Sequence, residues 1–133
     1  MRFLAIDYGK ARIGLAVSEV GIALPAGQIS AGKTATESAR LLFESVKSRA
    51  PFTKIIIGDP LYADGTASKM SAEVRFFGKA LQPFFPETEI IYYNERHTSS
   101  HAELLLAEDK NRKNKLDEMS ALMILRFYLS EHG

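Results

Sequence analysis

The first eighteen residues, Met1-Arg-Phe-Leu-Ala-Ile-Asp7-Tyr-Gly9-Lys-Ala-Arg12-Ile-Gly-Leu-Ala-Val-Ser18, decide the fold. Two apolar runs flank a short turn at residues 8–11, a pattern that predicts a β-hairpin. Asp7 stands at the end of the first predicted strand, where a charged group is poorly placed for core packing. Two interpretations are open at this point: Asp7 accepts hydrogen bonds from the turn amides, or it is a functional acid.

The composition indicates a single domain in a reducing compartment. With 133 residues the chain suits one domain over 1–133, and the absence of cysteine excludes disulfides, thiolate metal ligands and a cysteine nucleophile. No apolar run reaches the roughly 18 residues that span a bilayer, and no signal peptide is recognisable. We therefore expect a cytoplasmic protein with no membrane partner. The net charge of +1 means that a local basic patch must hold any polyanion.

Further strands and helices follow the hairpin. A third strand is predicted over residues 20–29, where Gly21 and Pro25 favour an edge position. Two more strands are predicted, over residues 54–57 and 89–93. The first predicted helix begins at the Thr34–Glu37 capping box and ends before Pro51, and the second covers residues 70–81. A third begins at the Ser100–Glu103 capping box, and the last begins near residue 117.

This order of elements predicts an α/β fold built on a mixed sheet. Short turns make the first three strands antiparallel, whereas the fourth and fifth strands return through helices and lie parallel to the first. We therefore predict a five-stranded mixed sheet in the order 3-2-1-4-5, with helices on both faces.

Acidic residues follow each of the three predicted parallel strands. Ligands of open α/β sheets bind beyond the carboxyl ends of such strands. Here those ends carry Asp7, Asp59 and Glu95, so we expect the three acids at one edge. Asp117 precedes Ala121 by one helical turn and is either the N-cap of the last helix or a fourth member of the group.

Several carboxylates at one edge indicate a divalent cation. Like charges within hydrogen-bonding range cannot all stay ionised, so some hold protons or a cation lies among them. Cysteine is absent and histidine occurs nearby only at 97 and 101, so the ligand set is rich in oxygen and favours Mg²⁺ or Mn²⁺ over zinc. Two such ions, roughly 3.5–4 Å apart, are the usual means of hydrolysing a phosphodiester.

Four motifs in one order give the chain a resemblance to a known family. Ala5-Ile6-Asp7-Tyr8-Gly9 with Arg12-Ile13-Gly14-Leu15-Ala16 resembles the opening motif of the YqgF family, bacterial RNase H-like proteins described as Holliday-junction resolvase-like and as candidate pre-16S rRNA nucleases. The other matches are Gly58-Asp59-Pro60-Leu61 with Asp64-Gly65, Glu95-Arg96 with Thr98-Ser99, and Asp117 with Ser120-Ala121. The resemblance covers essentially the whole chain.

The resemblance implies an RNase H-like fold and a metal-dependent endonuclease that acts on structured RNA. It implies maturation of the 5′ end of pre-16S rRNA, with cleavage of Holliday junctions as the alternative. The family's catalytic acids carry over to Asp7, Glu95 and Asp117, which would also bind two ions of Mg²⁺ or Mn²⁺. Our hypothesis gives Asp7 the position between the two ions, because it lies on the central strand. The chain has Asp59 where the family usually has a non-acidic residue, and this makes Asp59 an additional candidate ligand. It has Asn94 where the family usually has Asp.

Basic residues beside the acids are candidate contacts to nucleic acid. Lys10 and Arg12 follow Asp7, and Arg96 follows Glu95, with which it can instead form an ion pair. The expected partner is RNA, namely pre-16S rRNA, or branched DNA, and both a monomer and a homodimer are open. A further basic group next to Asp117 is either a phosphate contact or a solvated loop; it consists of Lys110, Arg112, Lys113 and Lys115.

Three classes of function therefore remain. The first is the metal nuclease, and the second is a nucleic-acid binding module without catalysis, which Asn94 mildly favours. The third is a kinase or ATPase, because a hairpin with Asp-x-Gly also opens the actin and sugar-kinase fold. That fold needs two such domains and a second phosphate loop, for which 133 residues are too few, so we rank it last.

Overall fold

The computed structural model describes residues 1–60, 68–94 and 112–132, and within the last range it describes side chains from Glu118 onward. In these ranges no helix is long and apolar enough to cross a membrane. The elements are β1 (Phe3–Tyr8), β2 (Arg12–Glu19), β3 (Ile22–Ser30), α1 (Ala35–Val46), the 3₁₀ turn η1 (Lys47–Arg49), β4 (Lys54–Asp59), α2 (Lys69–Leu81), the 3₁₀ turn η2 (Gln82–Phe84), β5 (Glu89–Asn94) and α4 (Arg112–His132).

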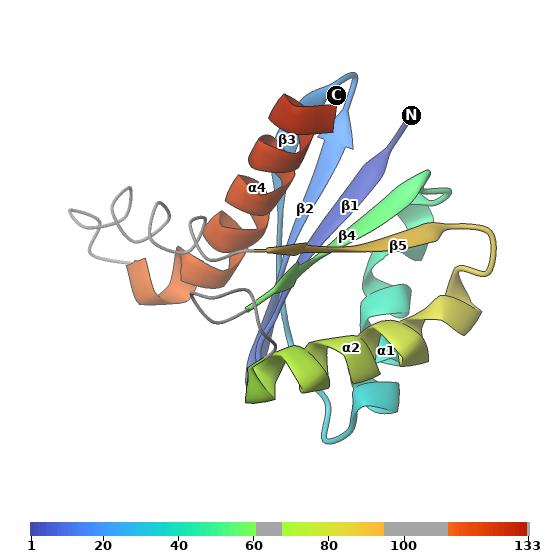
Figure 1. Ribbon diagram of the computed structural model, residues 1–133, viewed down its shortest axis with the longest axis vertical. Coiled ribbons are helices and arrows are strands. Elements are labelled where there is room, and N and C mark those ends of the chain that lie inside the picture. The colour runs from blue at the N-terminus through green and yellow to red at the C-terminus, as the bar shows by residue number, and fades with distance from the viewer. Residues whose placement is uncertain (61–67, 95–111, 133) are drawn as a thin grey trace.

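The five strands form one mixed sheet in the order β3-β2-β1-β4-β5 (Figure 1). β2 is antiparallel to both β1 and β3, whereas β4 is parallel to both β1 and β5. The predicted strand order and directions are thus confirmed. β3, with Pro25 inside it, is an edge strand as predicted, because proline cannot donate a ladder hydrogen bond.

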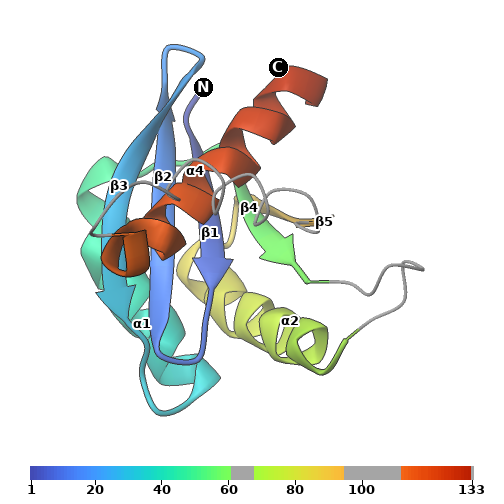
Figure 2. The ribbon, with the colours of Figure 1, turned by 90° about the vertical axis from the view of Figure 1, so that its left-hand side faces the viewer.

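Helices cover the sheet on both faces, as the sequence predicts (Figures 1 and 2). Alternate residues of each strand point to opposite faces. On β1, Leu4 and Ile6 pack with α1 and α2, whereas Phe3 and Ala5 pack with α4. The wholly apolar run of β4 follows from this layering, since Ile55, Ile56 and Ile57 are all fully buried.

α4 crosses its face of the sheet diagonally (Figure 2). Near its start, Glu118 Oε2 lies 3.9 Å from the position that a Cβ on Gly27 of β3 would occupy. Near its end, the ring of Tyr128 packs edge-on against Phe3 of β1, with the centroids 5.9 Å apart. The first turns of α4 therefore lie toward the end of the sheet at which β1 finishes.

Two predicted helix signals have the expected structural role. Thr34 is the N-cap of α1, and its hydroxyl oxygen accepts a hydrogen bond from the amide of Glu37 at 3.1 Å. α1 and the following 3₁₀ turn end just before Pro51. The predicted Ser100–Glu103 capping box and the Asp64-Gly65 turn lie outside the described residues.

The third strand begins at Ile22 rather than at residue 20 as predicted. Val20 and Gly21 instead form the turn between β2 and β3, with φ angles of 52° and 78°. Turns of this kind match the twist of a hairpin but strongly prefer Asn-Gly. Val20 is a β-branched residue in a conformation that costs it energy, and 95% of its surface is exposed.

We predict that Val20→Asn stabilises the protein by about 1 kcal/mol, because asparagine tolerates the left-handed backbone and no packing is lost. Urea unfolding monitored by circular dichroism measures this. Ile22→Asn is the matched control, since Ile22 is also exposed but lies in β3. A Val20→Asn protein with an unchanged or lower free energy of unfolding would contradict the interpretation.

Candidate active site at the end of strand β1

Asp7 lies half-buried near the end of β1. It follows Phe3 and Ala5 on alternate positions of the strand, so its side chain belongs to the face that α4 covers. The first turns of α4 lie toward the same end of that face. Asp7 therefore lies on the same face of the sheet as α4 and at the end of the sheet where α4 begins, as the predicted site requires.

The strands on either side of Asp7 carry glycine at its level. Gly14 on β2 is its partner in the antiparallel register. On β4, Gly58 follows Ile57, which is the partner of Ile6. Neither neighbour therefore places a side chain beside the carboxylate. Glycine at such strand positions often marks the close approach of a ligand or another backbone.

α4 begins earlier than the sequence predicts. The structure starts it at Arg112, which places Asp117 inside the helix and corrects the N-cap alternative, because an N-cap residue has a non-helical backbone. Arg112, Lys113 and Lys115 are likewise helical rather than part of a loop. Residues 112–117 contain arginine, lysine and leucine and lack glycine and proline, so the helix extends through them.

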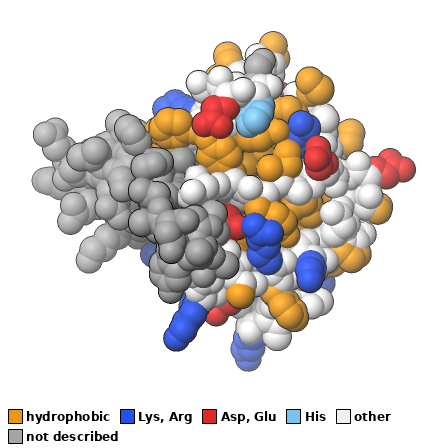
Figure 3. Space-filling model, viewed as in Figure 1, with side chains coloured by type: hydrophobic (Ala, Val, Ile, Leu, Met, Phe, Trp, Pro, Cys, Tyr) orange, Lys and Arg blue, Asp and Glu red, His pale blue; other side chains and the backbone are white. Residues whose placement is uncertain are grey.

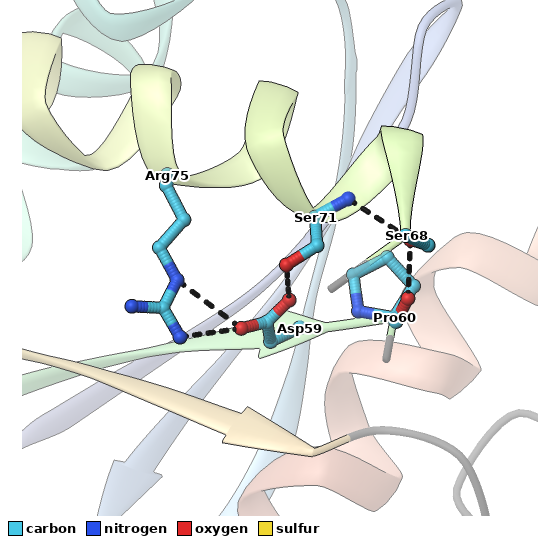
Figure 4. Close-up of polar contacts among 5 residues, drawn as sticks. All are labelled: Asp59, Pro60, Ser68, Ser71 and Arg75. Carbon is cyan, nitrogen blue, oxygen red and sulfur yellow. Dashed lines mark hydrogen bonds and ion pairs between the residues drawn. The ribbon is translucent and has the colours of Figure 1, made fainter. Parts of the chain in front are cut away.

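Asp59 lies at the same end of the sheet but on the opposite face. Its carboxylate is buried, with 1% exposed, and it contacts α2 (Figure 4). The Ser71 hydroxyl donates to Oδ1 at 2.5 Å, and Arg75 Nε and Nη2 donate to Oδ2 at 3.2 and 2.7 Å. This corrects the expectation that Asp59 joins Asp7 as an additional ligand, because alternation along the strands sends the side chains of Asp7 and Asp59 to different faces of the sheet.

We predict that Asp59→Ala lowers the free energy of unfolding by about 1–3 kcal/mol, because it leaves the buried Ser71 hydroxyl and the Arg75 guanidinium without their acceptor. Urea unfolding measures the change. Glu44→Ala is the control, since it breaks an exposed ion pair with Lys47 and should cost at most about 0.5 kcal/mol. The folded Asp59→Ala variant should still bind Mn²⁺. If it did not, Asp59 would have to be counted among the metal ligands.

The two tyrosines of β5 pack on opposite faces of the sheet. Arg75 lies over the Tyr92 ring at 4.3 Å from its centroid, and the Tyr92 hydroxyl occupies the place where a Cβ on Gly78 would stand. Burial raises the pKa of Tyr92, while the Arg75 charge opposes the rise. On the other face, the Tyr93 hydroxyl donates to Glu131 Oε1 at 2.7 Å. Burial and this carboxylate raise the pKa of Tyr93 to about 12.

The raised pKa of Tyr93 gives a pH prediction. The folded protein holds the phenolic proton up to about pH 12, whereas the unfolded chain loses it near 10. The contribution of Tyr93 to stability is therefore complete below pH 10 and is lost as the pH rises from 10 to 12. Urea unfolding of the wild type and of Tyr93→Phe at pH 9 and pH 11 tests this. Between the two pH values, the free energy of unfolding should fall further in the wild type than in the variant. Equal losses would contradict the assignment.

Beyond Asn94, which is exposed at the end of β5, the next candidates are not described. Glu95, Arg96 and Lys110 lie outside the described residues, as do His97 and His101. The backbone of α4 is described at Asp117, Arg112, Lys113 and Lys115, but their side chains are not.

The turn between β1 and β2 presents two of the predicted basic residues. Lys10 and Arg12 are both exposed there. Lys10 Nζ lies 3.7 Å from Glu73 Oε1 on α2, an exposed pair of small energetic value. A Cβ on Gly9 would stand 2.6 Å from the carbonyl oxygen of Arg12, so the turn requires glycine at this position.

Sequence reasoning missed the partners of Asp59. Ser71 and Arg75 are four residues apart on α2, a spacing that places them on neighbouring turns of one face. The available signal was the position of Ser71, which lies one turn before the buried Val74 on the apolar face of the helix and is therefore expected to be buried itself. Pairing it with Asp59 also requires knowing that α2 packs over the end of β4.

The described side chains do not by themselves form a metal site. Among them, no three His, Asp or Glu residues lie close enough together to hold an ion. Of the three predicted ligands, Asp7 is the one whose side chain is described. A half-buried carboxylate at a strand end, in a chain without cysteine, suits a hard divalent cation bound through oxygen. The donor chemistry at Asp7 therefore fits Mg²⁺ or Mn²⁺.

Comparison with known sequences identifies close relatives. A family model described as "RuvX: Holliday junction resolvase" matches residues 1–131. The chain is 38% identical over 139 residues to a Chlamydia abortus protein named "Putative pre-16S rRNA nuclease", a match that covers 98% of this chain and 91% of that protein. A Chlamydia pneumoniae protein of the same name is 38% identical over 135 residues, covering 96% and 88%.

Comparison with solved structures bears on the fold. Thermus thermophilus RuvC in complex with a Holliday junction substrate matches with a TM-score of 0.61 at 16% identity, over 99% of this chain and 96% of RuvC. This confirms the predicted RNase H-like fold. A ROK hexokinase from Thermus thermophilus matches with a TM-score of 0.51 at 15% identity, over 77% of this chain and 38% of the hexokinase. The likeness to the kinase is one of fold alone.

Proposed function

Because this chain belongs to the RuvX Holliday junction resolvase family, we propose that it is a divalent-metal-dependent endonuclease that hydrolyses phosphodiester bonds in structured nucleic acid. We propose pre-16S rRNA as the substrate, since the relatives from two Chlamydia species are named pre-16S rRNA nucleases, and we propose its 5′ end as the place of cleavage. We place the protein in the cytoplasm, where ribosomes mature in bacteria.

The placement of Asp7 carries the proposal. This acid lies at the end of β1, on the face that α4 covers, and glycine flanks it on both neighbouring strands. A carboxylate that only satisfied turn amides would need neither the glycines nor the approach of α4. Asp7 thus lies where a ligand that approaches along this edge would meet its carboxylate.

We propose that Asp7, Glu95 and Asp117 together hold two ions of Mg²⁺ or Mn²⁺. Asp117 lies one helical turn before Ala121, which is buried against the sheet, and Glu95 follows Tyr93 by two positions, the period of one strand face. In this arrangement Asp7 lies on the central strand, and Glu95 and Asp117 would complete the set of ligands that holds the ions. The bound ions would supply an activated water and charge stabilisation for the leaving oxygen.

The proposed substrate contacts are basic residues on two sides of this site. Lys10 lies on the turn that follows β1, and Arg12 is the first residue of β2. We add Arg96 and the basic group at 110–115, since Arg112, Lys113 and Lys115 fall in the first turns of α4. The N-terminus of a helix carries a partial positive charge, so basic side chains there are unfavourable and anions are favoured. A bound phosphate would therefore compensate the repulsion between these basic side chains and the helix dipole.

The test is a cleavage assay with three substrates in Mg²⁺ or Mn²⁺: a precursor 16S rRNA 5′-end fragment, a synthetic four-way DNA junction and a plain duplex. We expect metal-dependent cleavage of the RNA fragment. Cleavage of the junction alone would favour the second candidate, a resolvase, which the family description supports. Binding of the RNA without cleavage in either metal would overturn the nuclease proposal and leave a binding module.

A further inference from the structure

A pocket of about 380 Å³ lies on the other side of the strand end that carries Asp7. Its walls are the turn after β1, the segment that leads into α1, and the exposed side of α2. Tyr8, the residue after Asp7, belongs to its lining and stacks on Phe77 with the ring centroids 4.4 Å apart. The pocket thus shares its floor with the strand that carries the proposed catalytic acid.

Phe76 gives the pocket an exposed aromatic wall. Its surface is 68% exposed, whereas its neighbour Phe77 is fully buried. None of the other phenylalanines whose burial is described is exposed in this way. An exposed aromatic ring offers its face to a ligand, and rings of this kind stack on nucleobases.

Two lysines give the pocket a positive charge. Lys10 and Lys33 both line it and both are exposed. Glu73 is the one acid in the lining, and its pair with Lys10 is loose and solvated. Figure 3 shows further Lys and Arg side chains over the lower part of the molecule, around α2. A pocket lined by an exposed aromatic ring and by cations combines the two features with which proteins bind single-stranded nucleic acid.

The walls of the pocket are held in place by hydrogen bonds. The amide of Ala31 donates to the carbonyl of Ala11 in the turn after β1, at 2.9 Å. The amide of Gly32 donates to the hydroxyl of the buried Ser38 at 2.9 Å. A Cβ on Gly32 would stand 2.6 Å from the side chain of Glu37, so the segment packs closely on α1. These contacts fix the wall that leads into α1 against both the turn after β1 and α1 itself.

We infer that this pocket is a subsite for one unpaired nucleotide of the substrate strand, with its base against Phe76 and its phosphate between Lys10 and Lys33. The inference rests on the proposed action on nucleic acid. An unpaired nucleotide is required because a base inside a duplex cannot offer its face to Phe76. The strand would pass from Asp7 around the turn that carries Lys10, so the subsite binds a single-stranded segment next to the cut.

Binding measured without metal tests this separately from catalysis. The wild-type protein in EDTA is titrated into a fluorescein-labelled single-stranded RNA, its DNA counterpart and the matching duplex, and anisotropy gives the Kd. Phe76→Leu should weaken binding to both single strands roughly fivefold or more, while Phe76→Trp should restore it and duplex binding should change less than about twofold. A requirement for the 2′-hydroxyl would appear as tighter binding to RNA.

The charged residues supply matched variants. Lys33→Gln should weaken single-strand binding and reduce its salt slope by about 0.7. Glu73→Gln should tighten binding, because it removes a negative charge from the pocket. Lys79→Gln is the control, since Lys79 is also exposed on α2 but lines a different hollow, and it should leave Kd within about twofold.

Two results would overturn the subsite. One is wild-type affinity of Phe76→Leu for both single strands, and the other is an equal loss for single strand and duplex. The failure of the proposed nuclease is a different result, because it would show as absent cleavage in Mg²⁺ and Mn²⁺ while the effects of Phe76→Leu and Glu73→Gln on binding in EDTA remained.

Discussion

Asp7→Asn is expected to reduce the cleavage rate by roughly a hundredfold or more in Mg²⁺ or Mn²⁺, because the amide removes the charge that would bridge the two ions. The change keeps the size of the side chain at a half-buried position, so the fold should persist. Without metal, stability should be unchanged or slightly higher, since the variant relieves repulsion among carboxylates. Single-turnover cleavage of the RNA fragment gives the rate, and circular dichroism verifies the fold.

The matched control for Asp7→Asn is Asp59→Asn. Asp59 lies at the same end of the sheet, but its carboxylate contacts Ser71 and Arg75 on the other face. We expect this control to lose stability and to keep its cleavage rate at a temperature where it is folded. If Asp7→Asn cut RNA at the wild-type rate, or if the two variants lost activity equally, the assignment of Asp7 would fail.

Phe77→Ala is expected to cost about 3–5 kcal/mol of stability, the largest loss we predict for a single substitution. Phe77 is fully buried between α2 and the sheet, and its ring stacks on Tyr8. Alanine would leave a cavity beneath the residue that follows Asp7, and the loss is a large fraction of a typical total of about 5–15 kcal/mol. Urea unfolding at equilibrium measures it.

The adjacent Phe76 provides the control for this substitution. Phe76→Ala removes the same group from a side chain that is 68% exposed, so it should cost less than about 1 kcal/mol. The two variants should also separate by function, since Phe76→Ala weakens binding to single strands and keeps the fold. Equal losses of stability would show that the packing of α2 differs from the structure described.

The sequence predicted the sheet because each strand carried a local signal. The hairpin turn, the all-apolar run at 55–57 and Pro25 in the third strand determine pairing, burial and edge position without knowledge of the rest of the chain. The start of α4 was harder to predict. The basic residues within 112–116 are compatible with a solvated loop as well as with a helix, and no capping motif in the sequence indicated that the helix includes them.

The site was predictable to the extent that strand ends determine it. The rule that ligands bind beyond parallel strands placed Asp7 and Asp59 at one end of the sheet, but it did not say on which face each acid lies. That depends on the register, in which Asp7 follows Ile6 and Asp59 lies two residues beyond Ile57. The pocket beside Phe76 had no local signal, because its walls come from three separate segments.

The most direct test of the central claim is a crystal structure with Mn²⁺, with the ions located by their anomalous scattering. We predict a peak within about 2.3 Å of an Asp7 carboxylate oxygen, with Glu95 and Asp117 as ligands of the same cluster. The same crystals should show no peak at Asp59. A structure in which Mn²⁺ binds elsewhere, or in which Glu95 and Asp117 lie too far from Asp7 to share the ions, would contradict the account.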